Sequence, residues 1–313
     1  MGAHVKPPIV VGVDGSEQGL NAVQFAIGEA RRSGCGVRLV HALPEVATTS
    51  PGVPLAAYEI FDDVAQQVMQ QAEETARATS GGHVRLEKVV RTGTRVHVLV
   101  EASEGARLVV LGHRERSLRE RALTASTSTG VASRAHCPAV CLPSSWPGSN
   151  AHARVVVGIE DPAHAHELLS RAFAIASGRR ARLRVLHAWR LQRPYDDIMV
   201  GESEASDWGA EVTERLEAAT AELRSAFPEV EVEIVVRHQD PASALVAASD
   251  EADLLLLGRR RQTAPLGLQL GVTARALIRE SRCPVEITAV PPRRPDAAGE
   301  TRTAAEAGLS LRA

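Results

Sequence analysis

The sequence predicts an α/β fold built from two tandem copies of one unit, and three observations support this. Residues 11–14, 41–42, 111–112 and 137–138 match residues 157–160, 187–188, 257–258 and 283–284, all at one offset of 146 positions. The length of 313 residues suits about two domains. A composition of 44% hydrophobic and only 3% aromatic residues indicates Val, Leu, Ile and Ala cores, which are typical of a buried sheet under helices.

The first element of each copy is a short, continuously apolar run. Residues 9–13 predict a buried strand that ends at Asp14-Gly15-Ser16. A helix follows, because apolar residues recur at helical spacing and the second copy repeats them. These positions are Val23, Ala26, Ile27 and Ala30 in the first copy, and Leu169, Ala172, Phe173 and Ala176 in the second.

Second strands are predicted at residues 37–42 and 183–188, each followed by a connection that contains prolines and then by a helix. The first of these helices is expected to bury Ile60, Val64, Val68 and Ala72. Its counterpart shows the same period at Trp208, Val212 and Leu216, but these positions do not match at the offset of 146. Third strands follow at residues 84–90 and 230–236.

The last part of each copy contains the strongest strands, at residues 108–111 and 254–257, each preceded by a short helix near 97–101 or 242–248 and stopped by glycine. After a loop, a helix runs to the Cys-Pro pair at 137–138 or 283–284. Final strands follow at residues 139–142 and 285–289. Alternating strands and helices with right-handed crossovers predict a parallel sheet covered on both faces.

These elements divide the chain into four parts. We expect a first domain at residues 1–143, a linker rich in Pro, Ser and Gly at 144–153, a second domain at 154–290 and a disordered tail at 291–313.

The composition also bears on partners and location. With a net charge of −2 and arginines scattered among acids, the chain has no basic stripe for nucleic acid. Its longest aliphatic run, residues 254–257, is far too short for a membrane span, so no membrane partner is expected. The four cysteines form no Cys-x-x-Cys pair and no signal-like amino terminus is present, so we expect a cytoplasmic protein with core thiols.

Candidate binding residues follow the first strand. Ligands of open parallel sheets collect at the carboxyl ends of the strands, near the point where the strand order reverses. There, Gly12 and Gly15 allow close backbone approach, Asp14 can accept hydrogen bonds from a ribose, and Ser16 can cap a helix whose amino end favours anions. A purely structural Asp-Gly-Ser turn is the alternative interpretation.

Three motifs resemble the universal stress protein family over both copies: Val-Gly-Val-Asp-Gly-Ser at 11–16, Val-Leu-Gly at 110–112 and Cys-Pro-Ala-Val at 137–140. The resemblance implies two tandem Rossmann-like domains of the adenine nucleotide alpha hydrolase type, each with a five-stranded parallel sheet. It also implies tandem units that pair through their last strands, with a homodimer left open, and ATP binding in some members.

The resemblance further implies an ATP loop after the fourth strand, of the form Gly-x2-Gly-x9-Gly-Ser/Thr. The first copy departs from it, with Gly112, Glu115, Ala125 and Ser126 at these positions, followed by Thr127. The second copy has Gly258, Arg261, Gly271 and Val272. Since Glu115 repels phosphates unless Mg²⁺ or an arginine intervenes, Mg²⁺ is expected together with any ATP.

The first domain is therefore the one predicted to bind ATP or another adenine nucleotide. It keeps Asp14, where the family has its adenosine-contacting acid, whereas the second copy has Glu160. The resemblance places adenine near the end of the second strand, where main-chain groups around Ala42 can read the base edge. His41 and its repeat His187 are interpreted as structural residues.

The chain lacks the common catalytic signatures, including a Walker loop, a Gly-x-Ser-x-Gly elbow and His-Glu-x-x-His, so we expect no enzyme. Hydrolysis or adenylyl transfer is the weaker alternative. The second alternative is a nucleotide-independent dimerisation or interaction module, which the degenerate loops would permit. Four histidines near one edge of the second copy, His164, His166, His187 and His238, raise the possibility of a zinc site, but no metal is predicted.

Overall fold

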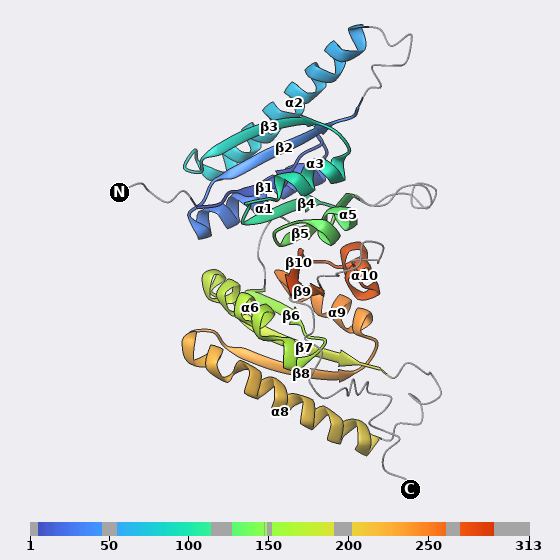
Figure 1. Ribbon diagram of the computed structural model, residues 1–313. Helices are drawn as coiled ribbons and strands as arrows, with labels where there is room; N and C mark the ends of the chain where they lie inside the picture. Colours follow the sequence, from blue (N-terminus) through green and yellow to red (C-terminus); the bar gives the residue numbers. More distant parts are fainter. Residues whose placement is uncertain are drawn as a thin grey trace.

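The computed structural model describes residues 6–45, 55–113, 127–146, 148, 152–190, 202–260 and 270–290, and shows two α/β units (Figure 1). The predicted tail and parts of the predicted linker lie outside these residues. Within the described residues, no helix is long and apolar enough to cross a bilayer.

The first unit contains a five-stranded parallel sheet. Its strands are β1 (Ile9–Gly12), β2 (Val37–Leu43), β3 (Leu86–Thr92), β4 (Leu108–Gly112) and β5 (Ala139–Leu142). Its described helices are α1 (Glu17–Ser33), α2 (Leu55–Ser80), α3 (Arg95–Ala102) and α5 (Thr127–Arg134). In the strand order β3-β2-β1-β4-β5, β1 pairs with both β2 and β4. The chain therefore adds strands on one side of β1 first and then on the other.

The second unit repeats this arrangement. Its strands are β6 (Arg154–Gly158), β7 (Arg182–Trp189), β8 (Val232–His238), β9 (Leu254–Arg260) and β10 (Val285–Val290). Its described helices are α6 (His166–Arg179), α8 (Glu202–Ala226), α9 (Pro241–Ser249) and α10 (Val272–Glu280), and a short 3₁₀ turn, η1 (Pro162–His164), precedes α6. The predicted fold class is confirmed in both units.

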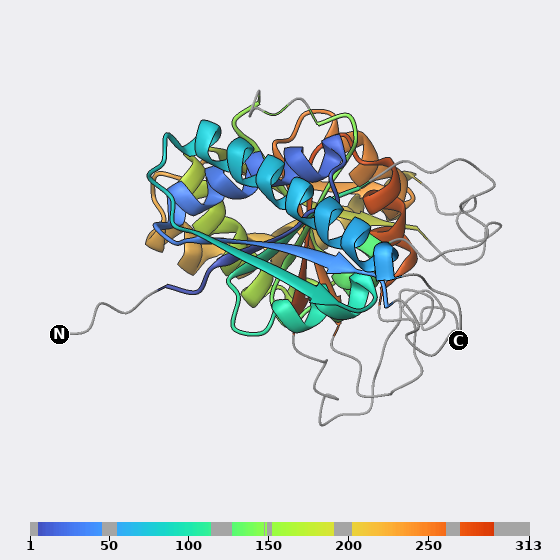
Figure 2. The same cartoon turned by 90° about the horizontal axis from the view of Figure 1, so that it is seen from above.

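The two units join through their last strands. β5 and β10 pair antiparallel, with Val140 opposite Glu286, so that one ten-stranded sheet crosses the whole molecule (Figures 1 and 2). One continuous core lies between the sheet and α1, α2, α6 and α8. A second core lies on the opposite face under α3, α5, α9 and α10, which gather on one side in Figure 1. Intramolecular pairing thus takes the form that the family resemblance implies.

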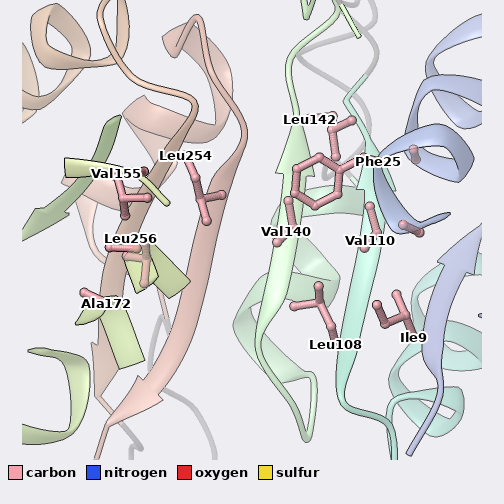
Figure 3. Packing of buried hydrophobic residues seen from close by; sticks show 14 of the residues in the cluster. Ile9, Phe25, Leu108, Val110, Val140, Leu142, Val155, Ala172, Leu254 and Leu256 are labelled. Carbon is pink, nitrogen blue, oxygen red and sulfur yellow. The ribbon is translucent and has the colours of Figure 1, made fainter. Parts of the chain in front are cut away.

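Helices α1 and α6 bury the faces predicted for them. Val23, Ala26 and Ile27 are fully buried, and so are their counterparts Leu169, Ala172 and Phe173. Figure 3 shows the core side chains on either side of the junction, with Val140 in the first unit and Leu254 in the second.

The predicted face of α2 is partly wrong. Val64 is 48% exposed, and the side chains that α2 buries are those of Ala65, Val68, Met69, Ala72 and Ala76. Residues four apart rotate by about 40° per step around an α-helix, so a row that is buried at Val68 and Ala72 lies off the buried stripe at Val64.

The edge strands begin two residues later than predicted. β3 starts at Leu86 and β8 at Val232, because these residues pair with Val37 of β2 and Leu183 of β7. Val230 is buried but lies before the ladder, so its apolar character reflects packing and not strand pairing.

A buried arginine connects the two units. Arg179 of α6 is 2% exposed at its side chain and donates from Nη2 to the carboxylate of Glu29 in α1. Its guanidinium lies 5.5 Å from the centroid of the Phe25 ring, which contacts Trp146 edge-on. Burial lowers the pKa of Arg179, and among the described residues its Nε and Nη1 have no hydrogen-bond partner. Glu29 therefore supplies most of the compensation for this buried charge.

We predict that Glu29→Gln lowers the free energy of unfolding by about 3 kcal/mol, because it leaves the Arg179 guanidinium buried without its counter-charge. Adding Arg179→Met to that variant removes the stranded charge and should restore part of the loss. Urea denaturation measures both effects, with the exposed substitution Glu101→Gln as control. A double variant less stable than Glu29→Gln alone would contradict this explanation.

Candidate functional site

The turn after β1 is a self-contained hydrogen-bond network. Gly15 has a φ of +77°, a left-handed conformation that favours glycine. The Oδ1 atom of Asp14 accepts a hydrogen bond from the Ser16 backbone N–H at 3.2 Å, and a second from the Ser16 hydroxyl. The Ser16 hydroxyl oxygen in turn accepts from the Gly19 N–H at 3.1 Å and so caps α1. The Asp-Gly-Ser segment thus forms the structural turn of the alternative interpretation. The side chain of Asp14 nevertheless remains exposed.

Five of the predicted site residues come together from separate elements. Gly12, Asp14, Ala42, Gly112 and Thr127 line one cavity of about 70 Å³ at the carboxyl edge of the sheet. The other lining residues are Val13, Gly19, Val40, His41, Arg95, Leu99, Leu111 and Ser128. Gly15 and Ser16 are in the adjoining turn and are not part of this lining. Ala125 and Ser126 lie outside the described residues, as does Glu115.

Arg95 also lines the cavity, although it is not among the residues predicted from the sequence. Arg95 is the first residue of α3, directly after Thr94, whose hydroxyl accepts from the His97 N–H and caps that helix. The signal was available, since α3 follows the carboxyl end of β3, and such ends meet at one edge of a parallel sheet. The exposed guanidinium gives the cavity a positive charge close to Thr127 and Ser128.

His41 and His187 perform the same structural task in the two units. The Nδ1 atom of His41 donates to the Val13 carbonyl at 2.8 Å, and that of His187 donates to the Ile159 carbonyl at 2.9 Å. Each bond attaches the second strand of a unit to the residue that follows its first strand. Both side chains are buried, so each bond is shielded from water.

The second unit has a cavity at the equivalent place, but it is much larger. Twelve of the thirteen lining positions in the first unit recur, 146 residues later, in a cavity of about 520 Å³. The two cavities therefore lie at equivalent positions of their units but differ in volume.

The start of the first helix explains this difference. In the first unit, a Cβ added at Gly112 would lie 2.2 Å from the Gln18 carbonyl oxygen, so the first turn of α1 presses on the end of β4. In the second unit, η1 intervenes and α6 begins at His166, three residues later than the offset predicts. A Cβ added at Gly258 would first meet side chains, with the nearest atom, from Val290, at 3.2 Å. The later helix start leaves the cavity open.

Among the described residues, no group of three His, Cys, Asp or Glu side chains is placed to hold a metal ion. The histidines considered for zinc are directed elsewhere: His164 pairs with Asp161 at 3.0 Å, His238 stacks on Trp189, and His187 packs against Trp208. Cys137, Cys141 and Cys283 are free and buried, and burial raises the pKa of each thiol to about 12. They are unreactive core residues.

We predict that Gly112→Ala destabilises the protein by about 2 kcal/mol more than Gly258→Ala. The new methyl group at position 112 meets backbone that cannot yield without moving α1, whereas at position 258 it meets side chains that can adjust. Urea denaturation of the two variants measures the difference. Equal losses would show that α1 does not press on the end of β4.

His187 should make stability depend on pH. Burial lowers its pKa below the ordinary value of 6.5, so the unfolded chain takes up a proton before the folded protein does. The free energy of unfolding should therefore be highest above pH 6.5 and fall as the pH drops below it. His187→Gln keeps a donor for the Ile159 carbonyl and should lose less stability between pH 7 and pH 5.5, as measured by urea denaturation. An identical pH dependence in both proteins would contradict this assignment.

Comparisons with known proteins agree with the duplication of the unit. The model of the universal stress protein family matches residues 7–143 and 152–288. Universal stress protein Rv1996 of Mycobacterium tuberculosis is 29% identical over 302 residues, covering 90% of this chain and 95% of the relative. Universal stress protein Rv2005c of the same organism is 30% identical over 288 residues, with 88% and 95% covered.

One solved structure has the same fold over both units, and a second matches a single unit. A universal stress protein from Archaeoglobus fulgidus has a TM-score of 0.66 at 19% identity, covering 91% of this chain and 97% of its own. A universal stress protein in complex with cAMP matches 44% of this chain, about one unit, with a TM-score of 0.35 and 23% identity. With both units matched by the family model and full-length relatives at about 30% identity, this chain belongs to the universal stress protein family.

Proposed function

We propose that this chain is a cytoplasmic stress-response regulatory protein that binds ATP or another adenine nucleotide in its first unit, with Mg²⁺, and does not turn the nucleotide over. The observation that carries the proposal is the cavity where Asp14, Ala42, Gly112 and Thr127, which are far apart in sequence, meet at the carboxyl edge of the sheet. Each brings a group that suits one part of a nucleotide.

The exposed carboxylate of Asp14 accepts hydrogen bonds from the ribose hydroxyls. Main-chain groups at Ala42 read the adenine edge, and Gly12 lets the ligand approach the backbone. Gly112, Thr127 and the amino end of α5 receive the phosphates, together with Ala125 and Ser126. Arg95 offsets phosphate charge, while Gly15 and Ser16 hold the turn that aims Asp14.

The size of the cavity sets a condition on binding. At about 70 Å³, it is smaller than the ~300–1,000 Å³ of ordinary small-molecule sites. A nucleotide can therefore enter fully only when the cavity widens, and we propose that the first turn of α1 moves away from Gly112 to allow this. The same small volume favours the second candidate function, a nucleotide-independent interaction module whose units are held together by the shared sheet.

Isothermal titration of the full chain with ATP, with and without Mg²⁺, tests the proposal. Saturable binding is expected, and Asp14→Asn should weaken it by about tenfold or more, because a neutral amide oxygen accepts a hydrogen bond more weakly than a carboxylate does. The equivalent substitution in the second unit, Glu160→Gln, should leave ATP affinity unchanged. If the wild-type protein binds no nucleotide under either condition, the interaction module is the better description, and product formed above a buffer control would instead establish an enzyme.

A further inference from the structure

The large cavity of the second unit differs from that of the first in chemistry as well as in volume. Its walls are mostly apolar, and the side chains that form them are those of Ile159, Leu168, Leu186, Leu245, Leu257 and Val290. At about 520 Å³, it lies within the range of pockets that hold small organic ligands. The volume alone would admit a nucleotide, so the ligand class must be inferred from the polar groups.

Three exchanges between equivalent positions make the second unit less suited to phosphate. The groups of the first unit that suit phosphates are replaced by apolar ones: Arg95 by Pro241 and Ser128 by Ala274. The same holds for the hydroxyl that the family loop places at Ser126, where the second unit has Val272. Two exchanges run the other way, since Glu115 corresponds to Arg261 and Ala125 to Gly271, a glycine that lines this cavity.

Carboxylates are gained instead. Glu160 replaces Asp14, and Asp161 replaces Gly15, so two acidic residues line the cavity of the second unit where the first has one. Glu160 is exposed at the rim, and Asp161 is half-buried. Asp161 and His164 pair with each other, so both groups are engaged, and Arg259 donates from Nη2 to the Ala135 carbonyl across the junction of the units. A polyphosphate entering this cavity would meet the exposed carboxylate of Glu160, which repels it.

We propose that the second unit binds a small apolar molecule that carries an amine or another cationic group at one end. The apolar body lies between Leu186, Leu245 and Leu257, and the cationic end faces Glu160 and Asp161. This site goes beyond the proposed nucleotide site and does not rest on it, because no residue of the first unit takes part in the recognition.

Three probes of nearly equal shape separate charge from burial: 2-naphthylmethylamine, 2-naphthylmethanol and 2-naphthoate. In titrations of the full chain, the amine should bind saturably and at least about tenfold more tightly than the carboxylate, with the alcohol between them. Saturating ATP should not displace the amine. Equal or tighter binding of 2-naphthoate, displacement of the amine by ATP, or no binding of the amine would each overturn the proposal.

Matched substitutions place the probe in one unit. Ala188→Leu fills the cavity of the second unit and should abolish amine binding, whereas Ala42→Leu at the equivalent position of the first unit should leave it unchanged. Glu160→Gln should reduce amine affinity to about that of the alcohol. Since Glu160 is exposed, this variant keeps the test decisive if Ala188→Leu does not fold, as judged by circular dichroism. Loss of binding in Ala42→Leu alone would contradict the assignment.

Discussion

The parallel pairing of the first strand in each unit with neighbours on both sides is the constraint on which the rest of the structure depends. β1 lies between β2 and β4, and β6 lies between β7 and β9. All these strands end at one edge of the sheet. The turn at Asp14, the end of β2 and the start of α5 therefore meet there, although they are far apart in the sequence. The same pairing in the second unit explains why equivalent positions line both cavities.

Joining the two sheets through β5 and β10 makes the molecule one layered body, with two cores that run across both units. The junction is more than backbone pairing, since α1 and α6 also meet at Glu29 and Arg179. Since α1 also contacts the second unit, a movement of α1 that opened the first cavity would change this contact. The proposed binding of a nucleotide to the first unit would thus be coupled, through α1, to the packing of the two units.

Much of the fold could be predicted because duplication repeats each pattern: the buried faces of α1 and α6 are the same positions 146 residues apart. Where periodicity alone was used, as for Val64, the prediction was wrong, because a four-residue row drifts around the helix. Edge strands were misplaced by two residues since their bounds follow from pairing with a neighbour. The predicted sheet topology places Asp14 and Gly112 at the same edge, but the volumes of the two cavities could not be predicted. These volumes depend on where the first helix of each unit begins. In the second unit η1 delays this start, although the matching residues stay 146 positions apart.

The two units thus carry cavities at equivalent positions, one small and lined by Arg95, the other larger, mostly apolar and lined by Glu160 and Asp161. Hydrogen exchange with and without ATP tests this most directly, because it reads both copies in the same experiment. The account predicts that ATP slows amide exchange at residues 12–19, 108–113 and 127–130, and leaves residues 158–166, 254–259 and 272–276 unchanged. Protection confined to the second set of residues would contradict it.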